Sequence, residues 1–390
     1  MTRYIARRLV QSAFLLFLIV TAVFGIFQVM PGDITAVLIQ PNIPPEARLE
    51  LIARLGLNRP AHERYVAYLG SLARFDLGTS FPTPTFRGGR PVTEIIAERL
   101  PRTLVLFQVV VLANYAIGFA IGKRIAWRRG RWPEYAATIA GVTLLNVFTP
   151  VAALSVLWLF ALELRLFPFG GWQEYAIWQP FIAQGLTSND VFVPMLVTAA
   201  LVVPWMAVVA RVSRGLDHRA SRRLARAAGA AAFGVLAVFW WQQAGLGRLA
   251  LDVLRHLALP TLTLVSLGFA GPMLVMRDSM LETMREDFVL TARAKGLPEP
   301  VVRDRHAARA ALLPIATSFA LAAALVVDGA VITETLFSWP GMGHALLRSV
   351  LEQNFPVTMG VVLVLAVAVL AAHLAVDLLY AWLDPRIRYD

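Results

Sequence analysis

The strongest constraint on the fold is a series of long apolar runs that contain no charged residue. A bilayer core is roughly 30 Å thick, and a helix rising about 1.5 Å per residue crosses it with about 20 apolar residues. Eight runs approach or exceed that length: residues 9–32, 103–122, 135–162, 191–210, 227–247, 256–276, 310–327 and 355–376. The last two continue past Asp328 to residue 333 and past Asp377 to residue 383. The sequence therefore predicts an all-α integral membrane protein with about eight spans.

Three of these runs have features that set them apart. The first follows Arg3, Arg7 and Arg8 and ends in the letters MPGD rather than in a small-residue cleavage site, which favours a retained span over a signal peptide. The run at 135–162 carries Pro150, so we expect it to be kinked or partly interfacial. The run at 227–247 is rich in Ala and Gly and is the least hydrophobic of the series.

The composition agrees with a membrane protein. Hydrophobic residues make up 58% of the chain and charged residues 16%, whereas soluble domains carry about 25% charged residues. A cytosolic enzyme is therefore disfavoured. The absence of cysteine excludes disulfides, thiolate metal sites and a cysteine nucleophile.

The net charge of +11 is explained by topology, because Lys and Arg near span ends stay on the cytoplasmic side. If both termini are cytoplasmic, 23 of the 36 basic residues lie inside, in the termini and in residues 123–131, 211–226 and 277–309. The short outer loops at 163–190, 248–255 and 338–354 hold four. No nucleic-acid partner is expected, since no basic patch alternates with exposed aromatics. The charged loops instead face membrane lipid.

No catalytic, cofactor or metal site is visible in the sequence. The stretch from Gly118 to Lys123 has one residue too few for a phosphate-binding loop and lies in a span. Gly118 and Gly122 instead fit the small-xxx-small pattern of close helix packing in membranes. The six histidines show no ligand spacing. We therefore expect no enzymatic centre, and any ATP chemistry must come from a partner.

Ionisable residues at membrane depth are candidates for a transport path, because charge there is costly and usually faces a cavity or a partner. Asp328 lies well inside the seventh span, and Glu334 follows about one and a half turns later. The two residues line a polar path for solute, or Asp328 is a structural element that is hydrogen-bonded between helices or protonated. The position of Asp377, near the cytoplasmic end of the last span, favours a structural role for this residue.

The largest inner segment, residues 277–309, indicates two helices joined at Gly296-Leu297-Pro298, with Pro298 and Pro300 in the first turn of the second helix. Its sequence EDFVLTARAKGL at 286–297, followed by RHAARAALLP at 305–314, resembles the cytoplasmic coupling loop of bacterial ABC importer permeases of the dipeptide/oligopeptide branch. Further matching motifs are spread along the chain: MPGD at 30–33, LGLNRP at 55–60, DLGTS at 76–80, PVTEIIAERLP at 91–101, ETLFSWPGMG at 334–343 and DLLYAWLDPRIRY at 377–389.

The resemblance implies a channel-forming subunit of the cytoplasmic (inner) membrane. Its implied partners are a second homologous permease, two cytoplasmic ABC ATPases and an extracytoplasmic solute-binding protein. The implied coupling residues, which would dock in a groove on the ATPase, are Asp287, Thr291, Ala292, Arg293, Ala294, Lys295, Gly296 and Leu297. Ala292 and Gly296 would allow close approach, and Arg293 and Lys295 would offer charge.

The same resemblance predicts an organisation into segments. These are a first span at 1–32, an extracytoplasmic segment at 33–91, a type I permease core at 92–383 with its coupling loop at 278–313, and a cytoplasmic tail at 384–390. The chain departs from the family in two ways. The motif that begins Glu-Ala-Ala reads Leu290-Thr291-Ala292 here, so the role of the glutamate cannot be transferred. Residues 172–255 also form an insertion with room for two spans beyond the family's six.

The predicted function is an ATP-driven import of di- or oligopeptides. Nickel, glutathione and oligosaccharides are alternative solutes of related systems. A self-sufficient secondary transporter would place its sites between repeated halves at the bilayer midplane, and no convincing repeat is visible. An intramembrane enzyme would need paired acids or metal ligands facing one another across spans, and none is visible either.

Overall fold

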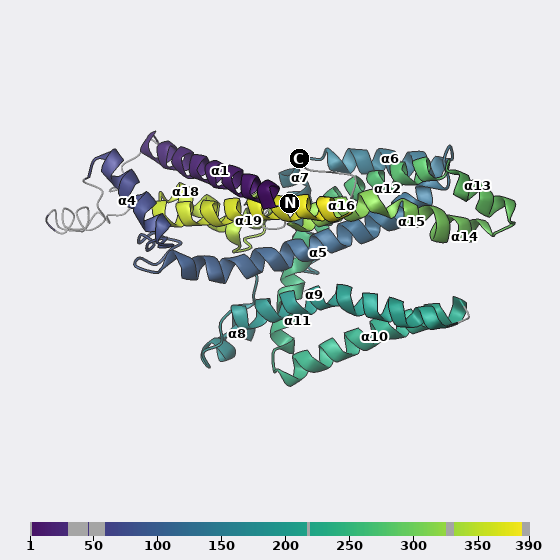
Figure 1. The fold of residues 1–390 in the computed structure, drawn as a ribbon. Coiled ribbons are helices and arrows are strands. Elements are labelled where there is room, and N and C mark those ends of the chain that lie inside the picture. The colour runs from purple at the N-terminus through teal and green to yellow at the C-terminus, as the bar shows by residue number, and fades with distance from the viewer. Residues whose placement is uncertain (1, 30–45, 47–58, 217–218, 325–330, 384–390) are drawn as a thin grey trace. The chain divides into compact units, whose positions relative to one another are not determined.

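A computed structural model describes residues 2–29, 46, 59–216, 219–324 and 331–383 (Figure 1). In these ranges the chain is helical, with no strand beyond an isolated bridge between Thr79 and Pro91. The predicted all-α class is thereby confirmed. The contacts divide the chain into a first unit (Met1–Leu100, Val327–Val331 and Pro340–Asp390) and a second unit (Pro101–Val326 and Ile332–Trp339).

Six helices of the described ranges are long and apolar enough to cross a bilayer: Arg7–Val29, Val92–Ala126, Asn189–Val212, Ala220–Gln243, Gly247–Thr283 and Phe355–Ala375. A seventh is obtained if Trp132–Leu145 and Thr149–Glu163 form one broken span. The predicted run from residue 310 corresponds to α16 (Leu312–Ala324), and its continuation, with Asp328, lies outside the described residues. The count of about eight therefore becomes six or seven described spans.

The third predicted span is broken, as its proline indicates. Helix α6 (Trp132–Leu145) and helix α7 (Thr149–Val156), which continues as the π-helical η1 (Leu157–Glu163), meet at an angle of 101°. Pro150 stands in the first turn of α7, where its missing N–H breaks no helical hydrogen bond. At the other side of the break, the Asn146 side chain donates to the carbonyl of Val142 over 2.7 Å.

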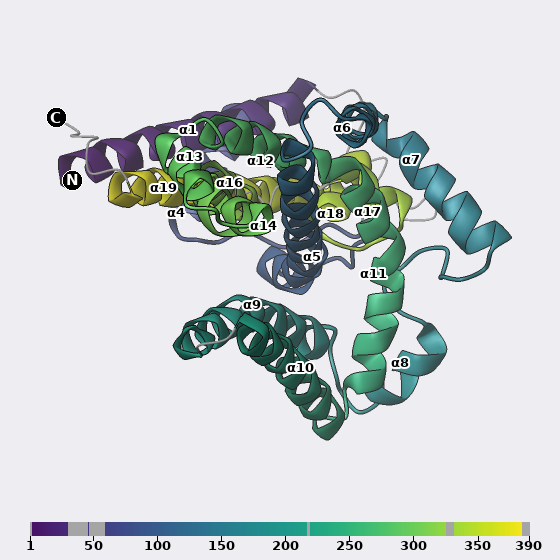
Figure 2. The same cartoon turned by 90° about the vertical axis from the view of Figure 1, so that its right-hand side faces the viewer.

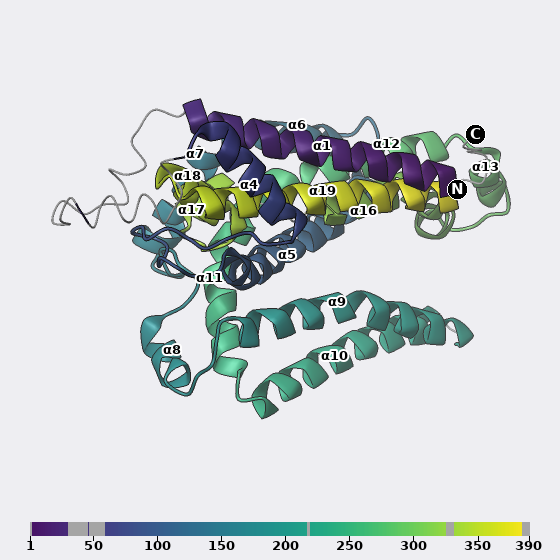
Figure 3. The ribbon, with the colours of Figure 1, turned by 60° about the vertical axis from the view of Figure 1, so that its left-hand side comes forward.

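In the first unit, α1 (Thr2–Val29) lies along α19 (Phe355–Leu383), as Figures 1 and 3 show. Aromatic side chains fasten α4 (Ala61–Ala73) to this pair. The Phe24 ring lies 5.0 Å from that of Tyr65 and 5.7 Å from that of Phe355, centroid to centroid. The hydroxyl groups of Thr21 and Tyr65 share a 2.6 Å hydrogen bond.

The loop at residues 81–90 contains bends and a turn, and it is attached to the junction between α18 (Met342–Leu351) and α19. The buried Asn354 side chain accepts from the backbone N–H of Phe81 over 3.2 Å and donates to its carbonyl over 3.0 Å. Phe86 then packs with Val92 at the start of α5 (Val92–Ala126). A single amide thus satisfies both backbone groups of Phe81.

The second unit contains most of α5 and every helix from α6 to α16. After η1 follow α8 (Tyr175–Ile182), α9 (Asn189–Val212), α10 (Arg219–Gln243), α11 (Gly247–Gly268) and α12 (Ala270–Thr283). Helices α9 and α10 fall in the interval 172–255, where two additional spans are predicted, and they pack together: Trp205 Nε1 donates to the Gly229 carbonyl over 2.8 Å. The segment 248–255, expected as a short loop, is instead the beginning of α11.

The basic connections of the second unit gather at one end of it. Figures 1 and 3 show the α9–α10 connection at the same end as the segment after α12, and Figure 2 views the unit from that end. The end of α5, from which the connection to α6 starts, lies at the same end, because Lys123 in its last turn forms an ion pair over 3.1 Å with Asp304 in the segment after α12. This arrangement agrees with the common cytoplasmic side that the charge distribution predicts.

Helix α5 contacts the junction of α11 and α12 through its two small residues. A Cβ at Gly118 would lie 2.8 Å from the carbonyl oxygen of Phe269 and from the amide nitrogen of Met273. A Cβ at Gly122 would collide with the carbonyl oxygen of Met273. The small-xxx-small interpretation is therefore confirmed, and the two backbones touch where any side chain would separate them.

This contact predicts that Gly→Ala substitutions lower the stability of the protein at Gly118 and Gly122 but not at a glycine with open space around it. Gly118→Ala combined with Gly122→Ala should destabilise the purified protein by about 1–3 kcal/mol, because the added methyl groups meet rigid backbone. Thermal unfolding in detergent should show a lower Tm. Gly25→Ala, in α1 with open space around the new Cβ, is the matched control and should not lower it. An unchanged Tm in the double variant would contradict the close approach.

Candidate functional site

The inner segment after α12 forms a compact elbow, which we define as residues 287–311. It begins with α13 (Asp287–Ala294) and ends with α14 (Glu299–Val301), the π-helical η3 (Val302–Ala307) and α15 (Ala308–Ala310). This is the helix, break and helix that the sequence predicts. Pro298 is the N-cap of the second part, and Pro300 stands in its first turn.

Helix α13 is terminated by Gly296 in the left-handed conformation, with φ of +68°. The N–H of Gly296 donates to the Arg293 carbonyl over 2.9 Å, and the N–H of Leu297 donates to the Ala292 carbonyl over 3.3 Å. This pair of bonds is the Schellman motif, which satisfies the last carbonyls of a helix and favours glycine at this position. Leu297 completes it by packing on the same apolar cluster as Ala292.

The inner face of α13 is anchored in a buried apolar cluster. Val289 and Ala292 are 0% and 4% exposed and pack with residues of five other helices. The remaining members of this cluster are Ala126, Met276, Met280, Val302, Ala307, Ala308, Ala311 and Ile315. An isolated helix of eight residues is not stable in water, so this packing holds α13 in place. The cluster therefore joins α13 to α5, α12 and α16.

The outer face of α13 is exposed and partly apolar. Phe288 is 44% exposed and Leu290 is 52% exposed, on either side of the buried Val289. Among the coupling residues predicted from the sequence, Asp287, Thr291, Arg293, Ala294, Lys295 and Gly296 are also exposed. The sequence prediction did not include Phe288 and Leu290, although an apolar pair around a core position is the signal that could have found them.

Ion pairs hold the two halves of the elbow together and to α5. Arg293 Nε lies 3.2 Å from Glu299 Oε1, and its guanidinium lies 5.2 Å from the centroid of the Trp127 ring. Its charge is thus engaged within the chain, while Lys295 stays exposed. A hydrogen bond from Arg303, assisted by one from Lys123, lowers the pKa of Asp304 to about 2. Asp304 is therefore ionised throughout the neutral range.

The structure describes only one of the two residues that were predicted to line a transport path. Asp328 lies outside the described residues. Glu334, in α17 (Val331–Leu336), is 0% exposed and accepts a 2.8 Å hydrogen bond from the Thr103 hydroxyl of α5. The turn after it is closed by Trp339, whose Nε1 donates to the Arg102 carbonyl over 3.1 Å. Glu334 thus fastens α17 to the start of the second unit, and its place in a path stays a prediction.

Two buried polar clusters were missed by the sequence reasoning. Arg277 of α12 donates to Glu134 Oε1 at the start of α6 from Nε over 2.9 Å and from Nη2 over 2.6 Å. Asp252 of α11 accepts from the backbone N–H of Glu174 and from Trp178 Nε1, both over 2.9 Å. Asp252 and His256 stand four residues apart on one helix, a spacing that could have indicated the second cluster.

The described residues offer no group of three His, Asp or Glu side chains that could hold a metal ion. What the elbow offers chemically is an interaction surface. A short helix presents apolar and charged groups on one side and packs against α5, α12 and α16 on the other.

Comparison with known proteins agrees with this description. The family described as the inner membrane component of binding-protein-dependent transport systems matches residues 191–389, and the N-terminal family of the same membrane components matches residues 1–107. A putative peptide permease protein of Brucella ovis is 31% identical over 393 residues, covering 100% of this chain and 99% of the relative.

Two further relatives also align over their whole length. The oligopeptide transport system permease protein AppB of Bacillus subtilis is 29% identical over 392 residues, covering 100% of both chains. The dipeptide transport system permease protein DppB of Escherichia coli K12 is 28% identical over 394 residues, covering 100% of this chain and 99% of the relative.

The described spans and these matches together indicate a multi-pass inner membrane protein. The chain belongs to the family of inner membrane components of binding-protein-dependent transport systems, the membrane-spanning permeases of ABC importers.

Proposed function

We propose that this chain is the permease subunit of an ATP-driven importer that carries di- or oligopeptides across the cytoplasmic membrane. In this proposal both termini are cytoplasmic, and the chain works with a second permease, two ABC ATPases and an extracytoplasmic solute-binding protein. The observation that carries the proposal is the elbow, whose outer face is exposed and whose inner face packs on α5, α12 and α16.

The proposed mechanism uses α13 as the contact with the ATPase. Phe288 and Leu290 provide the apolar area, and Lys295 provides a charge at the edge. Val289 and Ala292 connect this surface to α5, α12 and α16 through the buried cluster. Because packed interiors deform little, closure of the ATPases would move these helices together with α13.

The proposed solute rests on the relatives. Those compared are named as peptide, oligopeptide or dipeptide permeases and align with this chain from end to end. Solute choice in such a system lies mainly with the binding protein, so the test must include it.

The docking surface predicts a loss of coupling in Leu290→Asp. Leu290 is half-exposed and its replacement removes little packing within the chain, but a carboxylate would be buried against the partner. We expect ATPase activity stimulated by the loaded binding protein to fall at least about tenfold in reconstituted liposomes. Leu216→Asp, the same change at an exposed leucine between α9 and α10 and outside the elbow, is the control and should retain most of the activity. Equal activity of both variants would remove α13 from the interface.

The left-handed conformation of Gly296 predicts that different substitutions at this position destabilise the end of α13 to different extents. A left-handed conformation costs a branched residue about 1–2 kcal/mol, whereas Asn tolerates it. Hydrogen exchange of the α13 amides should therefore accelerate about tenfold in Gly296→Val and change little in Gly296→Asn. The measurement needs no partner protein. A faster exchange in Asn than in Val would contradict the capping role.

The solute assignment predicts which ligand activates the assembled importer. With candidate binding proteins present, di- and oligopeptides should stimulate ATP hydrolysis, and nickel chelates, glutathione and oligosaccharides should not. A response only to metal chelates, glutathione or sugars would overturn the peptide assignment. Transport by the permease alone, without ATPase subunits, would instead favour a secondary transporter.

A further inference from the structure

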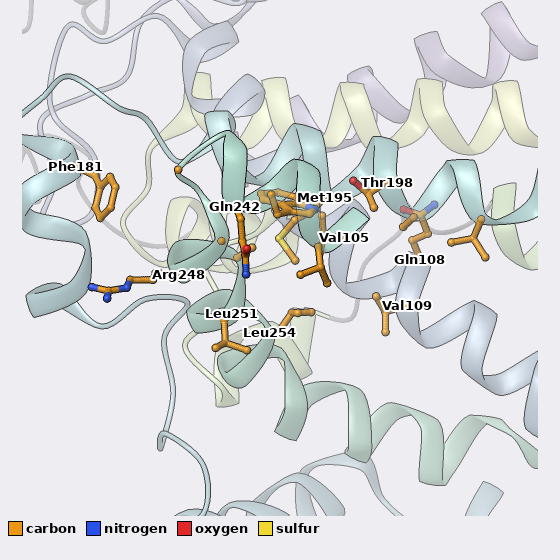
Figure 4. Close-up of a pocket in the computed structure, with 17 residues that line it drawn as sticks. Val105, Gln108, Val109, Phe181, Met195, Thr198, Gln242, Arg248, Leu251 and Leu254 are labelled. Carbon is orange, nitrogen blue, oxygen red and sulfur yellow. The ribbon is translucent and has the colours of Figure 1, made fainter. Parts of the chain in front are cut away.

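A large apolar cleft lies within the second unit, between α5, α9, α10 and α11. Its volume is about 920 Å³. Most of its wall is aliphatic or aromatic, with Val105, Met195 and Leu254 among the lining residues, and polar side chains are few: Gln108, Thr198, Gln242 and Arg248. Figure 4 shows Arg248 beside Phe181 at one end of the cleft and Gln108 with Val109 at the other.

A second, more polar pocket of about 610 Å³ adjoins the cleft between α8 and α11. Phe181, Arg248 and Leu251 line both, so the two pockets are neighbours along α11. The second pocket adds Asp252 and Arg255 to its wall. Since Arg248, Asp252 and Arg255 are spaced at four and three residues along α11, they share one helix face.

The charge of this polar pocket favours an anion. The Asp252 carboxylate already accepts from Glu174 and Trp178 and lies 3.4 Å from His256 Nδ1. Arg248 and Arg255 are exposed, and within the described ranges neither forms an ion pair. Guanidinium groups bind phosphate through paired, charge-assisted hydrogen bonds.

An apolar cleft beside a basic pocket matches the acyl chain and the phosphate group of a membrane lipid. Helices α5, α9, α10 and α11 are all span candidates, so the cleft is surrounded by acyl chains rather than water. The arginines stand in the first three turns of α11, at the end of the span where charged side chains reach the headgroup region. An uncharged transmembrane helix would fill the apolar compartment but leave both guanidinium groups without an anion.

We propose that these neighbouring pockets bind an anionic phospholipid, with its phosphate between Arg248 and Arg255 and one acyl chain in the cleft formed by α5, α9, α10 and α11. The lipid would hold the α9–α10 pair, which falls in the interval 172–255 predicted as an insertion, against α5 and α11. The pair is then a lipid-binding element, whatever solute the importer carries.

The test is retention of lipid by the full-length chain in detergent micelles, measured by native mass spectrometry during titration with phosphatidylglycerol or phosphatidylethanolamine. The wild type should retain one phosphatidylglycerol about tenfold more tightly than phosphatidylethanolamine. Arg248→Gln with Arg255→Gln should abolish this preference. Ala199→Trp, which places an indole in the cleft, should reduce retention of both lipids about tenfold.

Matched controls separate the site from the general lipid surface. Ala200→Trp adds the same indole one residue away on α9, where the side chain is exposed and outside the cleft wall. Arg211→Gln removes an exposed arginine at the other end of α9. Both should bind phosphatidylglycerol as the wild type does. The proposal is overturned if the wild type shows no preference for the anionic lipid, or if the arginine pair can be replaced without losing it. The arginine variants keep the test decisive even if Ala199→Trp fails to fold.

Discussion

The arrangement of the second unit depends on the backbone contact between α5 and the junction of α11 and α12. Lipid is as apolar as the helices, so it does not drive them together, and close packing of small residues must supply the association. Gly118 and Gly122 provide it by placing α5 directly against the Phe269 and Met273 backbone. Because α5 and α12 both end in the cluster beneath α13, the position of the elbow follows from this contact.

Buried polar pairs add further contacts between the helices to the close packing at the two glycines. Glu134 joins the start of α6 to Arg277 of α12, Asp252 joins α11 to Trp178 of α8, and Glu334 joins α17 to α5. An unpaired group of this kind is costly away from water, so each pair fixes the relative position of two elements. These pairs supply the orientation that uniformly apolar helix surfaces leave open.

Much of the fold and of the elbow could be predicted from the sequence. Long charge-free runs determine helices because the backbone must satisfy its own hydrogen bonds in lipid, and the glycine after α13 marks its end. The partners of Glu134, Asp252 and Glu334 could not be predicted, since each pairing joins residues far apart in the chain. The charged stretch at 248–255 was mistaken for a loop because its Asp252 is buried by α8, which only the tertiary structure places there.

The elbow and the proposed lipid site are connected by one continuous path of helix. Helix α11 begins at the cleft and continues through Phe269 into α12, which leads to α13. The backbone hydrogen bonds persist across that junction, with the Phe269 N–H donating to the Val265 carbonyl and the Met273 N–H to the Phe269 carbonyl, both over 3.1 Å. The two helices thus form one candidate span, Gly247–Thr283. A lipid held at Arg248 and an ATPase acting on α13 would therefore bear on opposite ends of the same span.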